Sequence, residues 1–253
     1  MNKILLNIIV FTSIFIEVCC GQELLVEKNK PNVKDVNEIL DDDTIVIYAN
    51  GAAGQMHRTY DEVNEFMHKH KEIQKVIIYT LLDDASMGED FYKYLSTWEQ
   101  VISFKHIFTT MLSDIRDNNF SYICLLTQLE EIHIYDVQLS NASYKKFVAF
   151  EKLKKLTLAK CNISDRNLRD IADMDNIQCS LQYLYFKGSD NISVKGIKEL
   201  RKLKNLKFLS IMYCKKISTN DLRELQRALP GVYIQIYDVP TKEKAKKIQW
   251  GWG

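Results

Sequence analysis

Apolar residues recur at fixed positions in the second half of the chain, in a pattern that is written five times. The copies are LEEIHIYDV from Leu129, LKKLTLAKCNIS from Leu153, LQYLYFKGSDNIS from Leu181, LKFLSIMYCKKIS from Leu206 and a shortened LPGVYIQIY from Leu229. Within each copy, polar and apolar side chains alternate as they do in a half-buried strand. A segment with helical apolar spacing follows each of the first four copies. The chain therefore alternates strands with helices at a short, regular period.

Repetition of one strand and one helix at this spacing is typical of a leucine-rich repeat solenoid. We expect an α/β fold with a parallel sheet on the concave side and helices on the convex side. A single unit buries only one side, so the units must stack to form a continuous core. The helices are predicted to begin at hydroxyl caps, which satisfy free N–H groups of the first turn. These caps are Ser140, Ser164, Ser193, and Ser218 or Thr219.

Weaker copies of the pattern precede the regular ones. Residues 44–50 (TIVIYAN) and 73–80 (IQKVIIYT) are predicted strands, and 104–112 (FKHIFTTML) is a third, with Thr109 where the second leucine belongs. Residues 91–101 have the apolar stripe of a buried helix. Residues 113–125 are expected to hold a short helix and a loop at 117–119. The solenoid is thus predicted to have seven or eight strands.

The composition changes along the chain and suggests five segments. Residues 1–21 have a lysine, an apolar stretch and small residues before a cut, as a secretory signal peptide does. An uncleaved membrane anchor is the alternative. Residues 22–43 form a polar leader or cap with at most one helical turn near 33–40. Residues 44–128 are degenerate repeats or an N-terminal cap, 129–238 are the leucine-rich repeats and 239–253 are a basic tail.

The charge is distributed unevenly, although the net charge is only +1. Acidic residues outnumber basic ones before Ile132, and basic residues outnumber acidic ones after it. Such a dipole can orient a charged partner, but solvated helix faces are the simpler explanation. The basic half lacks the concentrated patch of a nucleic-acid-binding protein. The basic tail, with two Trp, could touch an acidic partner or a membrane surface.

No catalytic, cofactor or metal motif is present in the sequence. The motifs of serine hydrolases, zinc proteases and phosphate-binding loops are missing, and Gly51–Gly54 lacks the Lys that such a loop requires. His68 and His70 are two apart, so they would point to different sides of a helix. We therefore expect a non-catalytic protein without a cofactor or metal.

Four cysteines remain once residues 1–21 are set aside. Cys161 and Cys214 occupy the same place in repeats two apart, so their backbones should be roughly 10 Å apart at the strand spacing. A disulfide spans no more than about 7 Å between Cα atoms. These two are predicted to be buried thiols, whereas a bond between Cys124 and Cys179 stays possible.

The side chains between the repeated leucines are predicted to form the exposed concave face, because strand side chains alternate. Aromatic residues are frequent there, and they are common in protein-binding surfaces. Packing of these rings as ordinary cross-strand pairs is the alternative. The predicted partner-binding residues are His133, Tyr135, Tyr183, Tyr185, Phe208, Met212 and Tyr233.

A secreted chain would also be a candidate for glycosylation. Four Asn-x-Ser sequons are present, and the first lies in the predicted loop, where we expect it to be the most accessible. The Ser of each of the other three is also a predicted cap or turn residue, which makes chance occurrence plausible. The sequon residues are Asn119, Asn141, Asn162 and Asn191.

Several segments of the second half resemble two known families. LKKLTLAKCNISDRNLRDI and LKFLSIMYCKKISTNDLREL look like the cysteine-containing repeats of F-box/leucine-rich-repeat proteins. FEKLKKLTLAKCNISDRNL, NISVKGIKELRKLKNLKFLSI and ALPGVYIQI are similar to the mitochondrial ATP synthase subunit s and distal membrane arm assembly component family, across residues 150–236. This resemblance implies a non-enzymatic role in assembling respiratory complexes. Ser189, where Cys is usual, and the signal-like N-terminus depart from it.

The sequence supports two hypotheses about function. The first is a secreted leucine-rich repeat scaffold that recognises a protein partner through its aromatic concave sheet. The second is an intracellular adaptor or assembly factor, either mitochondrial or linked to ubiquitin ligation.

Overall fold

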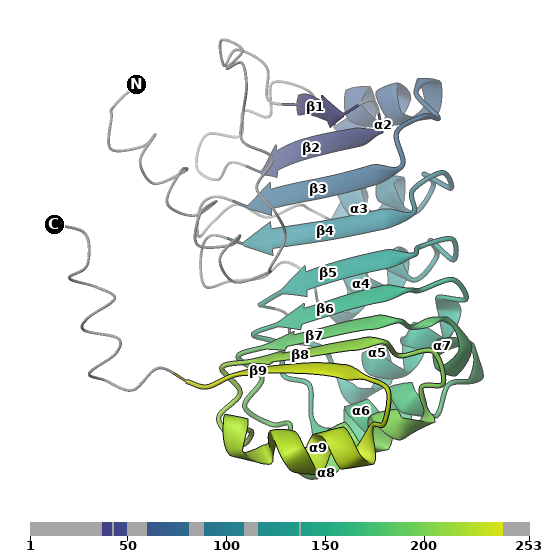
Figure 1. Ribbon diagram of the computed structural model, residues 1–253. Coiled ribbons are helices and arrows are strands. Elements are labelled where there is room, and N and C mark those ends of the chain that lie inside the picture. Colours follow the sequence, from purple (N-terminus) through teal and green to yellow (C-terminus); the bar gives the residue numbers. More distant parts are fainter. Residues whose placement is uncertain are drawn as a thin grey trace, which may run out of the picture. The chain divides into compact units, whose positions relative to one another are not determined.

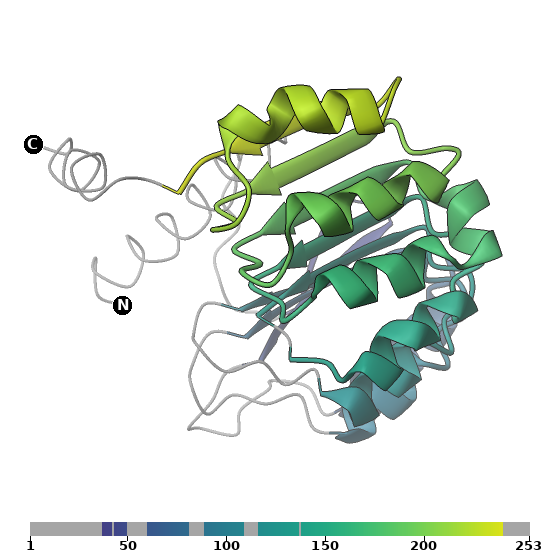
Figure 2. The same ribbon diagram turned by 90° about the horizontal axis from the view of Figure 1, so that it is seen from below.

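A computed structural model describes residues 37–41, 43–49, 60–80, 89–108, 116–136 and 138–239. One nine-stranded sheet runs through this part of the chain, with its strands in sequence order. Eight strands, β2 to β9, are parallel, and helices connect them on one face (Figures 1 and 2). The strands are β1 (Asn37–Asp41), β2 (Thr44–Ala49), β3 (Lys75–Thr80), β4 (Ser103–Phe108), β5 (Glu131–Tyr135), β6 (Lys155–Ala159), β7 (Tyr183–Lys187), β8 (Phe208–Met212) and β9 (Tyr233–Tyr237). The expected leucine-rich repeat solenoid is confirmed.

The helices connect successive strands, and several are one or two turns long. Some continue into or are preceded by a 3₁₀ turn, which is common at helix ends. They are α2 (Tyr60–Lys69), α3 (Glu89–Leu95), α4 (Asp117–Ile123), α5 (Asn141–Lys145), η1 (Lys146–Ala149), α6 (Asp165–Ala172), α7 (Asp175–Ser180), α8 (Val194–Glu199), η2 (Leu200–Lys202), η3 (Thr219–Asp221) and α9 (Leu222–Ala228).

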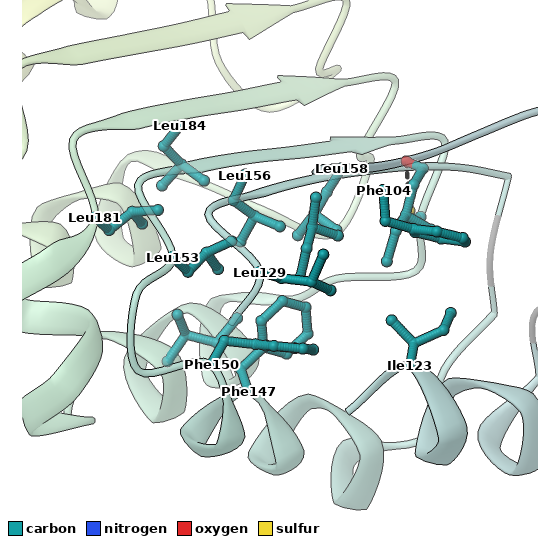
Figure 3. Packing of buried hydrophobic residues seen from close by; sticks show 14 of the residues in the cluster. Phe104, Ile123, Leu129, Phe147, Phe150, Leu153, Leu156, Leu158, Leu181 and Leu184 are labelled. Atoms are coloured by element: carbon teal, nitrogen blue, oxygen red, sulfur yellow. Dashed lines mark hydrogen bonds between the residues drawn. The ribbon is translucent and has the colours of Figure 1, made fainter. Parts of the chain in front are cut away.

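The core consists of ladders of apolar side chains that cross the sheet. Each of the strands β2 to β9 turns two side chains toward the core. The first of these two residues lies in register with its counterparts in the neighbouring strands, from Ile45 through Leu156 to Ile234. Figure 3 shows the leucines of successive repeats beside Phe147 and Phe150, which reach them from the helix side. The rings of Phe147 and Phe150 are 5.5 Å apart and nearly perpendicular, an arrangement that aromatic pairs favour.

A left-handed residue ends four successive strands. Asp136, Lys160, Gly188 and Tyr213 all have φ between 52° and 61°, and only one of them is glycine. The N–H of each donates to the last carbonyl of the next strand, for example from Gly188 to Met212 at 2.8 Å. The turn thus joins neighbouring repeats, and this bond offsets the strain of about 1 kcal/mol or more that a non-glycine residue meets in this region.

Hydroxyl residues occupy the predicted helix N-caps. Ser140 accepts from the N–H of Ser143, and Ser164 forms a reciprocal capping box with Asn167. The N–H and hydroxyl of Ser218 both donate to Asp221.

Ser193 is a cap of a different kind, because its side chain bonds to the preceding repeat. Its N–H and hydroxyl donate to the carboxylate of Asp165, at 2.7 and 2.6 Å. The N–H of Ser140 donates in the same way to Asp117, at 2.8 Å. In both cases a carboxylate at the first residue of a helix in one repeat bonds the N-cap of a helix in the following repeat.

Three predictions about the first half were wrong. Residues 37–41 form a strand, not a helical turn, because β1 pairs antiparallel with β2 and so covers the first edge of the parallel sheet. Residues 117–119 begin helix α4 instead of forming a loop. Helix α3 ends at Leu95, although the predicted stripe continues through Trp98 and Val101, which are buried in the turns that follow.

The third weak copy was also aligned incorrectly. The register places Phe104 beside Val76 and Ile132, and His106 beside Ile78 and Ile134. The core position of the second leucine is therefore held by His106 and not by Thr109, which lies outside the described residues. His106 is fully buried, its Nδ1 is 3.5 Å from the hydroxyl of Tyr92, and burial lowers its pKa to about 3.

His106 should make the fold sensitive to mild acid. The unfolded chain binds a proton here below pH 6.5, while the folded chain does not until about pH 3, so stability falls as the pH drops through that range. Between pH 6.5 and 5, before most carboxylates titrate, this site should cost about 2 kcal/mol. His106→Leu should flatten the dependence of the unfolding free energy on pH in that window, measured by urea titration. An unchanged slope would contradict this assignment.

Candidate functional site

The alternation of β7, β8 and β9 places aromatic side chains on the face of the sheet opposite the helices. Strand side chains point to alternate faces, so the leucines of these strands enter the core while the residues between them do not. The register sets Tyr183 beside Phe208 and Phe208 beside Tyr233. Tyr185 follows on the same face, beside the smaller Thr157 and Ser210.

These four rings form one connected group, here called the aromatic strip (Tyr183, Tyr185, Phe208 and Tyr233). The centroid of Phe208 is 5.1 Å from that of Tyr185, 5.8 Å from that of Tyr233 and 6.5 Å from that of Tyr183. The rings pack on each other, as the alternative of cross-strand pairs expects, and part of this aromatic surface is still accessible. Tyr233 is 63% exposed and Tyr183 is 38% exposed, while the other two are half-buried.

A basic residue borders the aromatic strip. The Nζ of Lys155 is 5.9 Å from the ring centroid of Tyr185, within the range of a cation–π contact. Lys187 is the last residue of β7. It lies two residues after Tyr185 and therefore on the same face of the sheet. An apolar aromatic surface beside ammonium groups is suited to a partner that presents apolar and acidic side chains together.

Two residues predicted to be exposed on this face are buried. His133 and Met212 are each only 8% exposed. His133 is flanked in register by Lys105 and Thr157, and Met212 is flanked by Lys187 and Tyr237. At the close strand spacing of a sheet, such neighbours cover a side chain even on the open face. Tyr135 is half-buried.

His133 contacts Glu131, but the contact is not a full ion pair at neutral pH. The Nε2 of His133 is 3.6 Å from the Glu131 carboxylate. Burial lowers the pKa of His133 below its ordinary value, so the ring is neutral near pH 7. The hydrogen bond from His133 lowers the pKa of Glu131, which stays ionised. The pair therefore carries the negative charge of Glu131, whose side chain is 43% exposed, while His133 contributes a neutral ring.

The sequons differ in how their amides are used. Asn162 donates from its side-chain nitrogen to the carbonyl of Leu139 at 2.8 Å, and its oxygen accepts from Leu139 N–H. Asn119, expected in an accessible loop, lies within helix α4 and is half-buried, so that expectation was wrong. Asn141 and Asn191 are exposed. The Asn141 oxygen accepts from the side-chain nitrogen of Asn167 at 2.8 Å, so its own nitrogen is the group that faces solvent.

The described residues contain no cluster suited to metal binding. No group of three or more His, Cys, Asp or Glu side chains converges there. In the same part of the chain, no helix has the length and apolar character needed to cross a membrane.

The thiols are structural, as predicted for Cys161 and Cys214. The Sγ atoms of Cys161 and Cys214 donate to the carbonyls of Ala159 and Met212, at 3.4 and 3.5 Å. None of the four described cysteines forms a disulfide, so the pairing of Cys124 with Cys179 left open by the sequence is not present. Burial raises the pKa of Cys124 to about 12 and that of Cys214 to about 11, which keeps both protonated.

Comparison with known proteins finds similarity both in sequence and in structure. No protein-family model matches the chain. The sequence is similar to ATP synthase subunit s, mitochondrial, of Rattus norvegicus, with 26% identity over 112 residues. That match covers 43% of this chain and spans 56% of the length of the rat protein. The structure is similar to an internalin from Listeria monocytogenes, with a TM-score of 0.40 and 16% identity over 70% of this chain and 55% of the internalin.

The described cysteines should differ sharply in their reaction with iodoacetamide. Cys179 is exposed, whereas Cys124, Cys161 and Cys214 are buried, and a thiol must be accessible and ionised to be alkylated. Brief treatment of the folded protein, followed by peptide mass spectrometry, should label Cys179 and spare the other three. All four should react in urea. Rapid native labelling of Cys161 or Cys214 would contradict the buried placement.

Proposed function

We propose that the chain is a non-catalytic leucine-rich repeat scaffold that binds a protein partner through the aromatic strip. The observation that supports this is the contact between four aromatic rings on the open face of the sheet, with Tyr233 largely exposed. Exposed rings in a contiguous group are unusual on a surface that only meets water.

The packing of the rings favours binding in a second way. Phe208 touches the other three rings, so its neighbours restrict its motion before a partner arrives. Aromatic side chains have few rotatable bonds, and a surface that is already ordered loses less entropy when it binds. Truncation of central aromatic residues in interfaces commonly costs 2 kcal/mol or more.

The central rings can be removed without touching the apolar ladders. Tyr185 and Phe208 are half-buried and point away from Leu184 and Leu209, which enter the core. Tyr185→Ala with Phe208→Ala should weaken partner binding by at least about tenfold, because each loss removes stacked area from the centre of the strip. The partner would first be identified by cross-linking in native material, then purified and titrated by calorimetry.

The matched control removes apolar surface elsewhere. Leu125 and Val148 are 62% and 59% exposed and lie outside the sheet, so Leu125→Ala with Val148→Ala should leave affinity unchanged. Circular dichroism checks that both double variants remain folded. Full affinity in the folded Tyr185 and Phe208 variant would refute the proposed binding surface.

A second candidate function is that of an assembly factor within mitochondria. The 26% identity with the rat ATP synthase subunit s favours it, and so does the absence of disulfides among the described cysteines, which is typical of reducing compartments. The signal-like residues 1–21 favour secretion instead. Both candidates use the same aromatic strip, so they differ in compartment and not in mechanism.

Mass spectrometry of the native protein separates the two compartments. A secreted protein should begin at Gln22 and carry sugar on Asn141 or Asn191. Asn162 should stay unmodified, because its side-chain nitrogen already donates to Leu139. Imaging of the full-length tagged chain provides the independent check. A protein without sugars that accumulates in mitochondria would overturn secretion and leave the assembly-factor proposal standing.

A further inference from the structure

The two ends of the sheet are finished differently. At the first end, β1 runs antiparallel to β2 and covers its edge. At the other end, β9 pairs with β8, and within the described residues no strand lies on its outer side (Figure 1). An uncovered edge strand presents N–H and C=O groups that can pair with another chain.

Hydrogen bonds to β8 identify which groups of β9 face outward. The N–H of Tyr233 donates to the carbonyl of Lys207, and the carbonyl of Tyr237 accepts from Tyr213, both at 2.8 Å. Backbone groups in a strand point alternately to its two sides, so those of Ile234 and Ile236 point away from β8. The available edge therefore consists of two isoleucine backbone units.

The sequence of β9 has none of the usual protection against edge pairing. Natural edges are commonly blocked by Lys, Pro or a bulge, but Tyr233–Tyr237 is YIQIY, which contains no charge and no proline. It is rich in residues that favour strands. Tyr233 and Tyr237, at its two ends, are 63% and 44% exposed.

This five-residue strand is also a palindrome, which gives it a self-complementary register. An antiparallel copy centred on Gln235 pairs Tyr233 with Tyr237 of the second copy, Ile234 with Ile236 and Gln235 with itself. The outward groups of Ile234 then meet those of Ile236 in hydrogen-bonded pairs, as the antiparallel pattern requires. A slip of one residue would set these groups against residues whose own groups point to β8.

The side chains suit the same register. No like charges meet in it. The Gln235 amide donates to the Tyr233 hydroxyl at 3.5 Å and accepts from the Tyr237 hydroxyl at 3.4 Å, and its second N–H and second oxygen lone pair can serve its copy. The tyrosines form cross-strand aromatic pairs, which are favourable in antiparallel sheets.

We propose that β9 is a homodimerisation edge, at which two copies of this chain pair antiparallel through Tyr233–Tyr237 about a twofold axis at Gln235. A self-complementary patch of this kind gives a closed, isologous dimer. The sheet continues from one copy into the other, and both open faces point the same way. This inference goes beyond the proposed function and does not depend on it.

Charge at the twofold axis tests the register directly. Gln235 is half-buried on the open face, and the proposed dimer brings it against its own copy. Gln235→Lys and Gln235→Glu should each weaken self-association at least tenfold, because like charges then face one another. An equal mixture of the two variants should restore association, since opposite charges meet. Sedimentation equilibrium of the full chain over a concentration series measures all three.

Other outcomes would overturn the proposal. A wild-type chain that stays monomeric throughout the series refutes it, as does a dimer that neither charge disturbs. If a chain ending at Val239 dimerises and the full chain does not, residues 240–253 occupy the edge of β9 in the full chain, and the proposed dimer is not formed by the full-length protein. If the charged variants fail to fold, Ile236→Pro provides a second test, because the N–H that it removes points away from β8. A dimer that survives Ile236→Pro also refutes pairing through this edge.

Discussion

Register between neighbouring repeats is the constraint on which this structure depends. A five-residue strand with one short helix cannot bury its apolar side alone, so every repeat is stabilised by the two that flank it. One apolar ladder runs without interruption from Ile45 to Ile234 because each strand pairs with the next at the same offset, and a second ladder beside it contains His106. A shift of one residue in a single strand would turn its leucines toward water. Polar contacts between repeats, such as that of Ser193 with Asp165, hold the same offset at the helix starts.

The sequence predicts the repeated half well, since its period, strands, caps and buried thiols all follow from local patterns. It predicts the first half less well for two physical reasons. Strand β1 has the sequence NEILD, whose Asn, Glu and Asp are depleted in strands, so its pairing with β2 was not recognised. His106 holds a core position that apolar pattern matching does not detect. The left-handed turns at Asp136, Lys160 and Tyr213 were missed because only the equivalent Gly188 has the residue usual for that conformation.

The aromatic strip was predictable in membership but not in extent. Alternation identifies Tyr183, Tyr185, Phe208 and Tyr233 as residues on the open face, and they lie there. It also assigns His133 and Met212 to that face, but both are buried there. Facing away from the core and being accessible are different properties, and the second depends on the size of the neighbours in register. The palindrome of β9 could have been found in the sequence, but its significance depends on its position at the uncovered end of the sheet.

The strict alternation along each strand also separates two kinds of selection. Substitutions at Leu156, Leu184 or Leu209 change the stability of the solenoid, whereas substitutions at Tyr183, Tyr185 or Phe208 change only the surface between them. Under the proposed function, changes in the second set alter which partner is bound while the architecture persists.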